Sequence, residues 1–287
     1  MPELPEVEIV KKSLERNIRS KLIKRILVKN RNLRYKLSKK FEKLLTGKKI
    51  LKVRRFSKYL IVHLNDQSFL IIHLGMSGTI HLEKKNIKNN TTNTSFYHNP
   101  VLPKKHNHIF IYFDDVKFIY NDPRRFGYLK IIKNKKKLKQ HFNHFGPEPF
   151  SKNFNINYLK KYLNKKEKCI KNFLLDQQFV SGIGNIYSSE ILFECKINPE
   201  TKAKYLKFSD LSNIIKYSIL ILNKAIKDGG SSIRNFKNAK GKKGSFQKNF
   251  KVYGRDNKNC LKNDCNGIIM KKNIGNRSSF FCNFCQK

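Results

Sequence analysis

The sequence predicts an α+β protein made of an N-terminal antiparallel β-sandwich, a helical domain and a small C-terminal zinc ribbon. Three observations support this fold class. Short runs of β-branched and aromatic residues follow one another between positions 22 and 132 without a helical repeat. From about position 135, apolar residues recur every three or four positions, which is typical of helices. Four of the six cysteines lie within the last 28 residues.

The sandwich is expected to begin with a helix, because apolar residues near the N-terminus are spaced by three or four and so share one helical face. These residues are Leu4, Val7, Val10, Leu14 and Ile18. Pro5 is compatible with this helix because it falls in the first turn, where its missing N–H is not needed.

The strands are bounded by Gly, Asn, Asp and Pro, which favour turns. They are expected at residues 22–28, 50–56, 59–64, 69–74, 108–113, 116–120 and 128–132. Asp114 and Asp115 are typical of a hairpin connection between the strands expected at residues 108–113 and 116–120. Many short strands without helices between them favour an antiparallel sandwich. The polar stretch from Glu83 to Lys105 indicates a long surface loop.

The second half of the chain has a helical period. Helices are expected near residues 155–163, 169–178, 185–195 and 209–227. The last should begin at Ser209 and Asp210, which suit an N-cap, and stop at Gly229 and Gly230. We therefore expect four segments: a sandwich domain over 1–133, a helical domain over 134–230, a loop and linker over 231–256, and a zinc finger over 257–287.

The charge of the chain indicates a polyanionic partner. Lys and Arg total 62 against 20 Asp and Glu, which gives a net charge of +42. A field of this size attracts polyanions and speeds their capture. The abundance of Lys, Asn and Ile also fits an AT-biased genome, so composition alone does not distinguish DNA, RNA, ribosomal or membrane-surface partners.

The first residues carry acid and proline where a signal peptide needs basic and apolar residues. The longest apolar runs, such as residues 219–222, are too short to cross a bilayer. We therefore expect a cytoplasmic protein whose cysteines are reduced or bound to metal. Cys169 and Cys195 lie on helical patterns and are expected to be buried apolar thiols.

The clustered cysteines predict a metal site. Cys260 and Cys265 are separated by four residues, Cys282 and Cys285 by two, and 16 residues lie between the pairs. Zinc takes four soft ligands in a tetrahedron, and two close pairs on two turns supply them. We expect one structural Zn²⁺, whose binding supplies folding free energy to a ribbon too small for a core of its own.

The N-terminus carries a candidate nucleophile. Removal of Met1 would expose the secondary amine of Pro2, and an α-amino group with a pKa of about 7.7–8.0 is partly neutral at pH 7. Such an amine can attack a sugar C1′ and form a Schiff base. Glu3 and Glu6 are candidate acids beside it. Proline and glutamate are also ordinary in a first helical turn, and the pattern alone favours that interpretation.

Several further segments carry distinctive motifs. They are residues 1–8 (MPELPEVE), 55–59 (RFSKY), 73–78 (HLGMSG), 122–127 (DPRRFG), 144–149 (HFGPEP), 182–187 (GIGNIY) and 252–255 (VYGR). In order and spacing, with the cysteine pairs closing the set, they resemble the motifs of bacterial formamidopyrimidine-DNA glycosylases. The resemblance covers essentially the whole chain.

The resemblance implies catalytic roles for four residues. Pro2 resembles the nucleophile that forms the Schiff base at C1′, and Glu3 resembles the proton donor that helps to open the sugar. Lys58 matches a lysine that contacts the lesion region and phosphate and serves in β-elimination. Arg277, between the cysteine pairs, matches an arginine that grips phosphate and assists δ-elimination; on pattern alone it would be a solvated hairpin charge.

The resemblance also implies DNA-binding residues. Met76, Arg124 and Phe126 match the residues that fill the hole left by a flipped nucleotide, where an apolar wedge and a cation offset part of the unstacking cost. Pattern alone would place Met76 and Phe126 in the core. His106 matches a DNA-contacting position.

Lys166 matches another DNA-contacting position, with the neighbouring Lys165 and Lys168 as alternatives. Asn185 lies where the family has a helix–two-turn–helix, whose backbone N–H groups and Asn amide bind phosphate. A plain helix-breaking loop is the alternative. Residues 231–250 correspond to a loop that closes over the everted purine.

Together these features imply a bifunctional DNA glycosylase and AP lyase. It would excise oxidised purines, 8-oxoguanine or formamidopyrimidines, from double-stranded DNA and then cleave the strand by β,δ-elimination. We expect a monomer at the bacterial nucleoid that needs no redox or nucleotide cofactor. Two alternatives are an endonuclease VIII-like glycosylase for oxidised pyrimidines and a non-catalytic basic zinc-ribbon protein that binds nucleic acid. Two departures from the family are the wide first cysteine pair and the long 83–105 loop.

Overall fold

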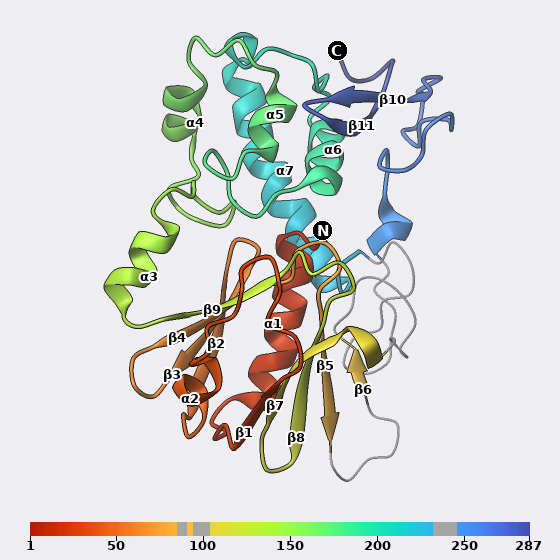
Figure 1. Ribbon diagram of the computed structural model, residues 1–287. Coiled ribbons are helices and arrows are strands. Elements are labelled where there is room, and N and C mark those ends of the chain that lie inside the picture. Colours follow the sequence, from red (N-terminus) through yellow and green to blue (C-terminus); the bar gives the residue numbers. More distant parts are fainter. Residues whose placement is uncertain (85–90, 94–103, 232–245) are drawn as a thin grey trace. The chain divides into compact units, whose positions relative to one another are not determined.

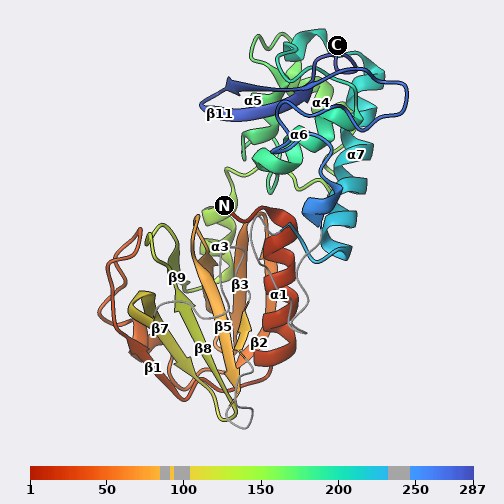
Figure 2. The same ribbon diagram turned by 90° about the vertical axis from the view of Figure 1, so that its right-hand side faces the viewer.

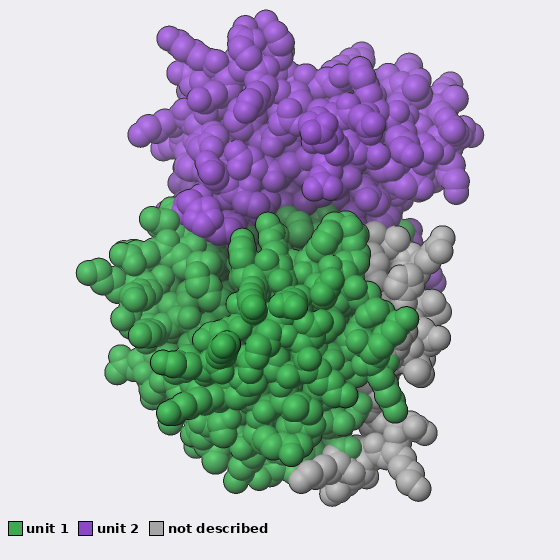
Figure 3. Space-filling view, viewed as in Figure 1, with its two compact units in different colours: residues 1–143, 226–247 green, residues 144–225, 248–287 purple. Residues whose placement is uncertain are grey.

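The computed structural model describes residues 1–84, 91–93, 104–231 and 246–287. The chain forms two compact units (Figure 3): unit 1 comprises Met1–Asn143 and Ile226–Gln247, and unit 2 comprises His144–Ala225 and Lys248–Lys287. The helices are α1 Leu4–Ile18, α2 Phe41–Leu45, α3 Lys135–Phe142, α4 Ile156–Leu163, α5 Ile170–Leu175, α6 Asn185–Glu194 and α7 Phe208–Lys227. The strands are β1 Arg25–Val28, β2 Ile50–Phe56, β3 Tyr59–Leu64, β4 Phe69–His73, β5 Thr79–Lys84, β6 Thr91–Asn93, β7 Asn107–Tyr112, β8 Val116–Asn121, β9 Tyr128–Ile132, β10 Ile269–Ile274 and β11 Arg277–Cys282.

Unit 1 contains the predicted antiparallel sandwich. One sheet has the order β1-β7-β8-β5-β6 and the other the order β2-β3-β4-β9. Every pairing within them is antiparallel. Strands β7, β8 and β5 run side by side in Figure 2. The connection of β7 to β8 is the expected hairpin over Asp114 and Asp115, closed by a 3.0 Å hydrogen bond from the Phe113 N–H to the Val116 carbonyl.

The core of unit 1 lies between the two sheets and α1. Helix α1 has the expected bounds and buries Val7, Val10, Leu14 and Ile18 in this core. Alternate residues of the strands complete it, including Leu60 of β3, Leu82 of β5 and Phe118 of β8. Figure 1 shows α1 alongside the sandwich strands, and it contacts β2 and β3.

Helix α3 belongs to unit 1, although the sequence places it at the start of the helical domain. Leu138 and Phe142 of α3 pack on Ile61, Ile71 and Ile132, which face away from the main core. The four-stranded sheet is therefore covered on both faces, which explains why all five residues of β4 are buried.

The structure corrects several expected boundaries. Strand β5 and helix α2 were not expected, β1 begins at Arg25 and not at position 22, and β6 lies within the expected loop. The β5 sequence alternates between polar and apolar residues from Thr79 to Glu83, but this short run leads directly into the polar stretch that indicates a loop. Thr79 and His81 are buried as well as Ile80 and Leu82, so both faces of β5 are covered. Helix α7 begins at Phe208, one residue before the expected N-cap. Of the expected 83–105 loop, residues 85–90 and 94–103 lie outside the described ones.

Unit 2 contains the expected helices and the two-stranded sheet β10-β11. Phe193 of α6 packs with Val252, Ile269 and Phe280, so the C-terminal ribbon shares a core with the helices. The buried Glu190 carboxylate accepts the backbone N–H groups of residues 251, 252 and 253 at 2.8, 3.1 and 2.8 Å. Burial raises the Glu190 pKa above its ordinary value, although these three N–H groups oppose the shift.

Within the described residues, the helices are all too short or too polar to cross a membrane.

Two buried histidines of unit 1 predict its response to acid. Burial lowers the pKa of His73 and of His81 from 6.5 to about 4, and the Lys58 charge contributes at His73. Between these values the unfolded chain binds a proton that the folded one does not. The stabilising contribution of each neutral histidine to the free energy of unfolding is therefore fully present above pH 6.5. It is lost as the pH falls toward 4, and the loss is about 3 kcal/mol for each histidine.

We therefore expect His81→Gln to reduce the acid-dependent loss of stability by about 3 kcal/mol or less, measured from urea midpoints between pH 7 and pH 4. His144→Gln, at an exposed position, is the matched control, and its urea midpoint should change with pH as that of the wild type does. An unchanged slope in His81→Gln would contradict the assignment.

Candidate active site

The N-terminus of unit 1 is held by a buried carboxylate. Pro2 and Glu3 are buried, with Glu3 only 3% exposed, whereas Met1 is 43% exposed. Glu6 Oε2 accepts the Glu3 N–H at 2.9 Å, and its Oε1 accepts the N–H and the hydroxyl of Ser231, both at 2.9 Å. One side chain therefore fixes both the residues around the candidate nucleophile and the segment that follows α7.

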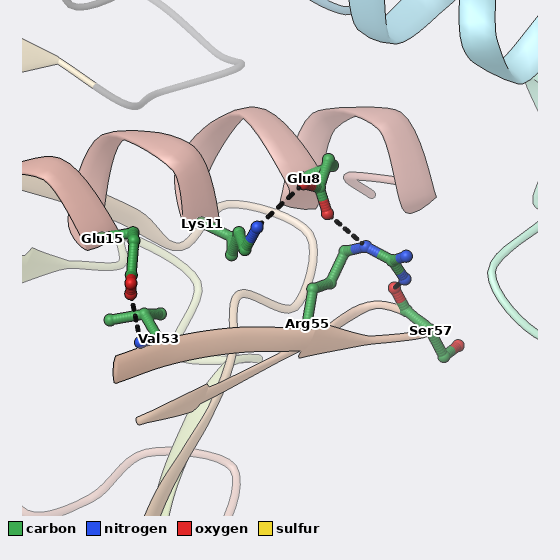
Figure 4. Close-up of polar contacts among 6 residues, drawn as sticks. All are labelled: Glu8, Lys11, Glu15, Val53, Arg55 and Ser57. Atoms are coloured by element: carbon green, nitrogen blue, oxygen red, sulfur yellow. Dashed lines mark hydrogen bonds and ion pairs between the residues drawn. The ribbon is translucent and has the colours of Figure 1, made fainter. Parts of the chain in front are cut away.

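Lys58 is placed by a strained hairpin between β2 and β3. It is buried, and the preceding Ser57 has a φ of 52°, a conformation that non-glycine residues rarely adopt. Arg55 Nε donates to Glu8 at 2.9 Å and its Nη1 donates to the Ser57 carbonyl at 2.9 Å (Figure 4). Arg55 therefore links the first turns of α1 to the hairpin that carries Lys58, a role that the sequence did not predict.

His73 lies at the end of β4, near Lys58. Its Nδ1 accepts the Gly75 N–H at 3.2 Å, which places the ring proton of the neutral form on Nε2. Its pKa of about 4 keeps the ring neutral at physiological pH. Of these two neighbouring side chains, Lys58 carries a positive charge and His73 does not.

The structure brings Met76, Arg124 and Phe126 together on two adjacent loops of unit 1. Met76 is 38% and Phe126 45% exposed, so neither is a core residue. The Arg124 guanidinium lies over the Phe126 ring at 4.5 Å. A Cβ on Gly75 would lie 2.4 Å from the Phe126 carbonyl carbon, so the two backbones are in direct contact. An exposed apolar pair beside a cation is the chemistry that a wedge between bases requires.

Unit 2 brings Asn185 next to Arg277. Asn185 begins α6, and its Nδ2 donates to the Ser278 carbonyl at 2.8 Å, directly after the exposed Arg277. The second Nδ2 hydrogen remains for another acceptor. A Cβ on Gly275 would lie 2.2 Å from Asn172 Oδ1, so the β10–β11 turn lies against α5.

A buried lysine supports this arrangement. Lys171 has no exposed surface, and its Nζ donates to Ser189 Oγ at 2.6 Å and to the Asn185 carbonyl at 3.3 Å. Sequence alone gave no signal for Lys171, because buried and solvated lysines look alike in a chain with so many of them.

The remaining predicted DNA contacts lie elsewhere in the two units. His106 of unit 1 is half-buried, and its carbonyl accepts the Asp122 N–H at 3.1 Å. Lys166 of unit 2 is exposed and lines a pocket of about 870 Å³ together with Tyr158 and Tyr162. Of the loop predicted to close over the purine, residues 231–250, the stretch 232–245 lies outside the described residues, and Phe246–Asn249 form a short 3-10 helix.

The four C-terminal cysteines form a cluster that fits a metal ion. Their Sγ atoms all lie within 4.8 Å of one another, with 3.8 Å between Cys260 and Cys285 and 3.7 Å between Cys265 and Cys282. Four sulfurs about 2.3 Å from a tetrahedral zinc are separated by about 3.8 Å, so the spacing suits zinc. A Cβ on Gly267 would lie 2.5 Å from Cys282 Sγ, which explains the glycine.

The wide first cysteine pair does not open this cluster. Its additional residues extend toward α6, where Lys262 Nζ donates to the Phe193 carbonyl at 3.2 Å and lies 4.4 Å from the Phe193 ring. Lys262 therefore places a cation at the C-terminal end of α6, where the helix dipole favours positive charge, and shares the Phe193 carbonyl with the Lys196 N–H.

Comparisons with known proteins agree with this geometry over the whole chain. The family model of the formamidopyrimidine-DNA glycosylase N-terminal domain matches residues 1–129, and that of the formamidopyrimidine-DNA glycosylase H2TH domain matches residues 145–237. A formamidopyrimidine-DNA glycosylase of Rickettsia africae is 40% identical over 287 residues, covering 100% of this chain and 99% of the relative. One of a Wolbachia strain is 38% identical over 288 residues, with 100% of both covered.

Solved structures of Lactococcus lactis FPG are similar as well. A variant bound to a Fapy-dG containing DNA has a TM-score of 0.88 and 34% identity, with 100% of both chains covered. A complex with an abasic site containing DNA has a TM-score of 0.86 and 34% identity, with 99% of both covered. This chain therefore belongs to the formamidopyrimidine-DNA glycosylase family, the DNA glycosylases and AP lyases of base excision repair.

Proposed function

We propose that this enzyme excises oxidised purines from double-stranded DNA through a Schiff base at Pro2 and then removes the sugar by β,δ-elimination. The observation that carries the proposal is the buried, hydrogen-bonded N-terminus, in which Glu6 holds the backbone directly after Pro2. A catalytic amine must be held in place to react as an intramolecular nucleophile would. The Fapy-dG containing DNA in the Lactococcus lactis complex supports a ring-opened or oxidised purine as the substrate.

The chemistry begins with loss of Met1, since the Pro2 nitrogen is otherwise an amide. The neutral amine attacks C1′, and the N-glycosidic bond breaks with its electron pair going to the departing base, which takes up a proton. Glu3 protonates the ring oxygen as the sugar opens, which leaves an iminium between Pro2 and C1′. Lys58 serves in the loss of the C2′ proton and the 3′-phosphate, and Arg277 assists the departure of the 5′-phosphate. Hydrolysis of the iminium restores the amine.

DNA binding is proposed to use both units. Met76, Arg124 and Phe126 fill the space vacated by the everted nucleotide, while Asn185 donates to phosphate beside the lesion. His106 and Lys166 bind the flanking backbone. The +42 charge makes capture fast and dependent on salt. We place the enzyme, as a monomer, at the nucleoid in a bacterial cytoplasm, where its substrate lies.

The cysteine cluster is proposed to hold one structural zinc ion. Cys260, Cys265, Cys282 and Cys285 would bind it as thiolates, and the metal would stabilise the hairpin that carries Arg277. The zinc supplies folding free energy and no reaction chemistry.

Borohydride trapping on a duplex with one 8-oxoguanine opposite cytosine tests the nucleophile. The mature protein should give a covalent protein–DNA band. Pro2→Gly replaces the ring-fixed secondary amine by a flexible primary one. It should lower the yield of the covalent band about 100-fold, because a misplaced reacting group reacts more slowly. A form extended by two residues before Pro2 should give no band while still binding the duplex. A covalent band that forms only with an oxidised pyrimidine would favour the endonuclease VIII-like alternative. Binding of the duplex without any covalent band would favour the non-catalytic nucleic-acid-binding alternative.

Arg55→Met tests the placement of Lys58. Loss of the links to Glu8 and Ser57 should slow cleavage of a preformed abasic site about tenfold, because the hairpin strain is no longer opposed. Lys11→Met is the matched control, since it removes a different 3.2 Å bond to Glu8 and leaves Arg55 in place (Figure 4). Equal rates in the two variants would contradict the role given to Arg55.

Zinc removal tests the metal centre. Cys265→Ser should lower the zinc content well below one ion per chain and weaken duplex binding, because the Arg277 hairpin loses its main source of stability. Cys169→Ser should keep both at the wild-type level. Metal analysis and fluorescence anisotropy measure the two quantities, and a zinc-free Cys265→Ser with undiminished binding would contradict the account.

A further inference from the structure

Asp122 is a buried carboxylate that takes no part in the chemistry proposed above. It has no exposed surface. Its Oδ2 accepts the Gly127 N–H at 2.8 Å and the Tyr120 hydroxyl at 3.1 Å, and its Oδ1 accepts the Ser77 hydroxyl. A buried carboxylate is stable only when its oxygens receive donors, so these partners are required by its position.

These hydrogen bonds join the two loops that present the wedge. Ser77 directly follows Met76, and its Oγ also accepts the Arg124 N–H at 3.2 Å. Gly127 directly follows Phe126. The Asp122 carboxylate therefore contacts the neighbours of Met76 and Phe126 in sequence, and reaches Arg124 through one hydroxyl.

A third element meets the same residue. The backbone N–H of Asp122 donates to the His106 carbonyl at 3.1 Å, and its carbonyl accepts the Arg125 N–H at 3.2 Å. Arg125 has a φ of 56°, so the loop between Arg124 and Phe126 is bent into a conformation that a non-glycine residue rarely adopts. Such a loop persists only where its surroundings hold it.

We propose that Asp122 is the positioning residue of the wedge, which holds Met76, Arg124 and Phe126 in their inserting arrangement before DNA binds. The inference rests on the proposed function of these three residues. A wedge that is already formed has less side-chain and loop freedom to lose when it enters the stack, so Asp122 sets the rate of base eversion and not that of bond cleavage.

The test compares two variants with one control. Ser77→Ala removes the hydroxyl that joins the loops, and Asp122→Asn replaces one acceptor by a donor. Tyr120→Phe removes another bond of the same carboxylate but leaves the loops joined. Each is mixed with a duplex that carries 8-oxoguanine and a neighbouring 2-aminopurine, whose fluorescence reports unstacking. Each is also mixed with a duplex that carries a preformed abasic site, which has no base to evert.

Ser77→Ala and Asp122→Asn should slow the fluorescence rise and 8-oxoguanine excision about 10- to 100-fold, while abasic-site cleavage changes less than about threefold. Tyr120→Phe should resemble the wild type. Equal losses on both duplexes would indicate a general structural role and overturn the inference. So would an unslowed Ser77→Ala, whose half-buried hydroxyl can be removed even if Asp122→Asn does not fold.

The same experiment separates this inference from the proposed function. Wild-type protein that unstacks the lesion without excising it would refute the proposed chemistry, and the fluorescence rates of the variants would still decide the role of Asp122. Wild-type excision with unslowed unstacking in both variants would refute Asp122 alone.

Discussion

A catalytic amine at a chain terminus, such as the one proposed at Pro2, must be held still, although the first residues of a protein are ordinarily among its least ordered. Here the buried Glu6 carboxylate provides that restraint. It accepts the Glu3 N–H with one oxygen and the N–H and hydroxyl of Ser231 with the other. Hydrogen bonds to an ionised group are stronger than neutral ones, and burial makes each costly to break. The placement of Pro2 and of the segment after α7 both depend on this one side chain.

Buried carboxylates accept backbone N–H groups at two other places in the described residues. Asp122 holds the wedge loops, and Glu190 accepts three successive backbone N–H groups at the entrance to the C-terminal ribbon. The chain has 62 basic and 20 acidic residues, and three buried acids, Glu6, Asp122 and Glu190, each accept backbone N–H groups. Basic residues outnumber acidic ones by 42, and the resulting positive field attracts DNA.

The two units divide the proposed work. Unit 1 carries Pro2, Lys58 and the proposed wedge, and unit 2 carries Asn185 and Arg277, which are proposed to bind phosphate. Within unit 2 this pair depends on the ribbon being folded against α5 and α6, since Asn185 donates to the strand that Arg277 begins. A metal ion proposed for the cysteine cluster would therefore act on the proposed phosphate contacts by stabilising this ribbon.

Sequence predicted much of this architecture but few of its supporting contacts. Period and turn residues placed α1, the hairpin at Asp114 and the cysteine cluster, because each has a local cause. Strand β5 was not predicted because its polar–apolar alternation, from Thr79 to Glu83, is short and leads directly into the polar stretch that indicates a loop. The supporting roles of Arg55, Asp122 and Lys171 were not predicted. Burial of a charged side chain depends on partners that are distant in sequence, and a local sequence pattern does not identify those partners.

The central claim is that the Pro2 nitrogen, and no lysine, forms the covalent bond to C1′. The most direct measurement is peptide mass spectrometry of the borohydride-reduced protein–DNA complex after digestion of both components. The account predicts that the sugar remnant lies on the N-terminal peptide and fragments with Pro2. A remnant on the peptide that contains Lys58, with Pro2 unmodified, would contradict it.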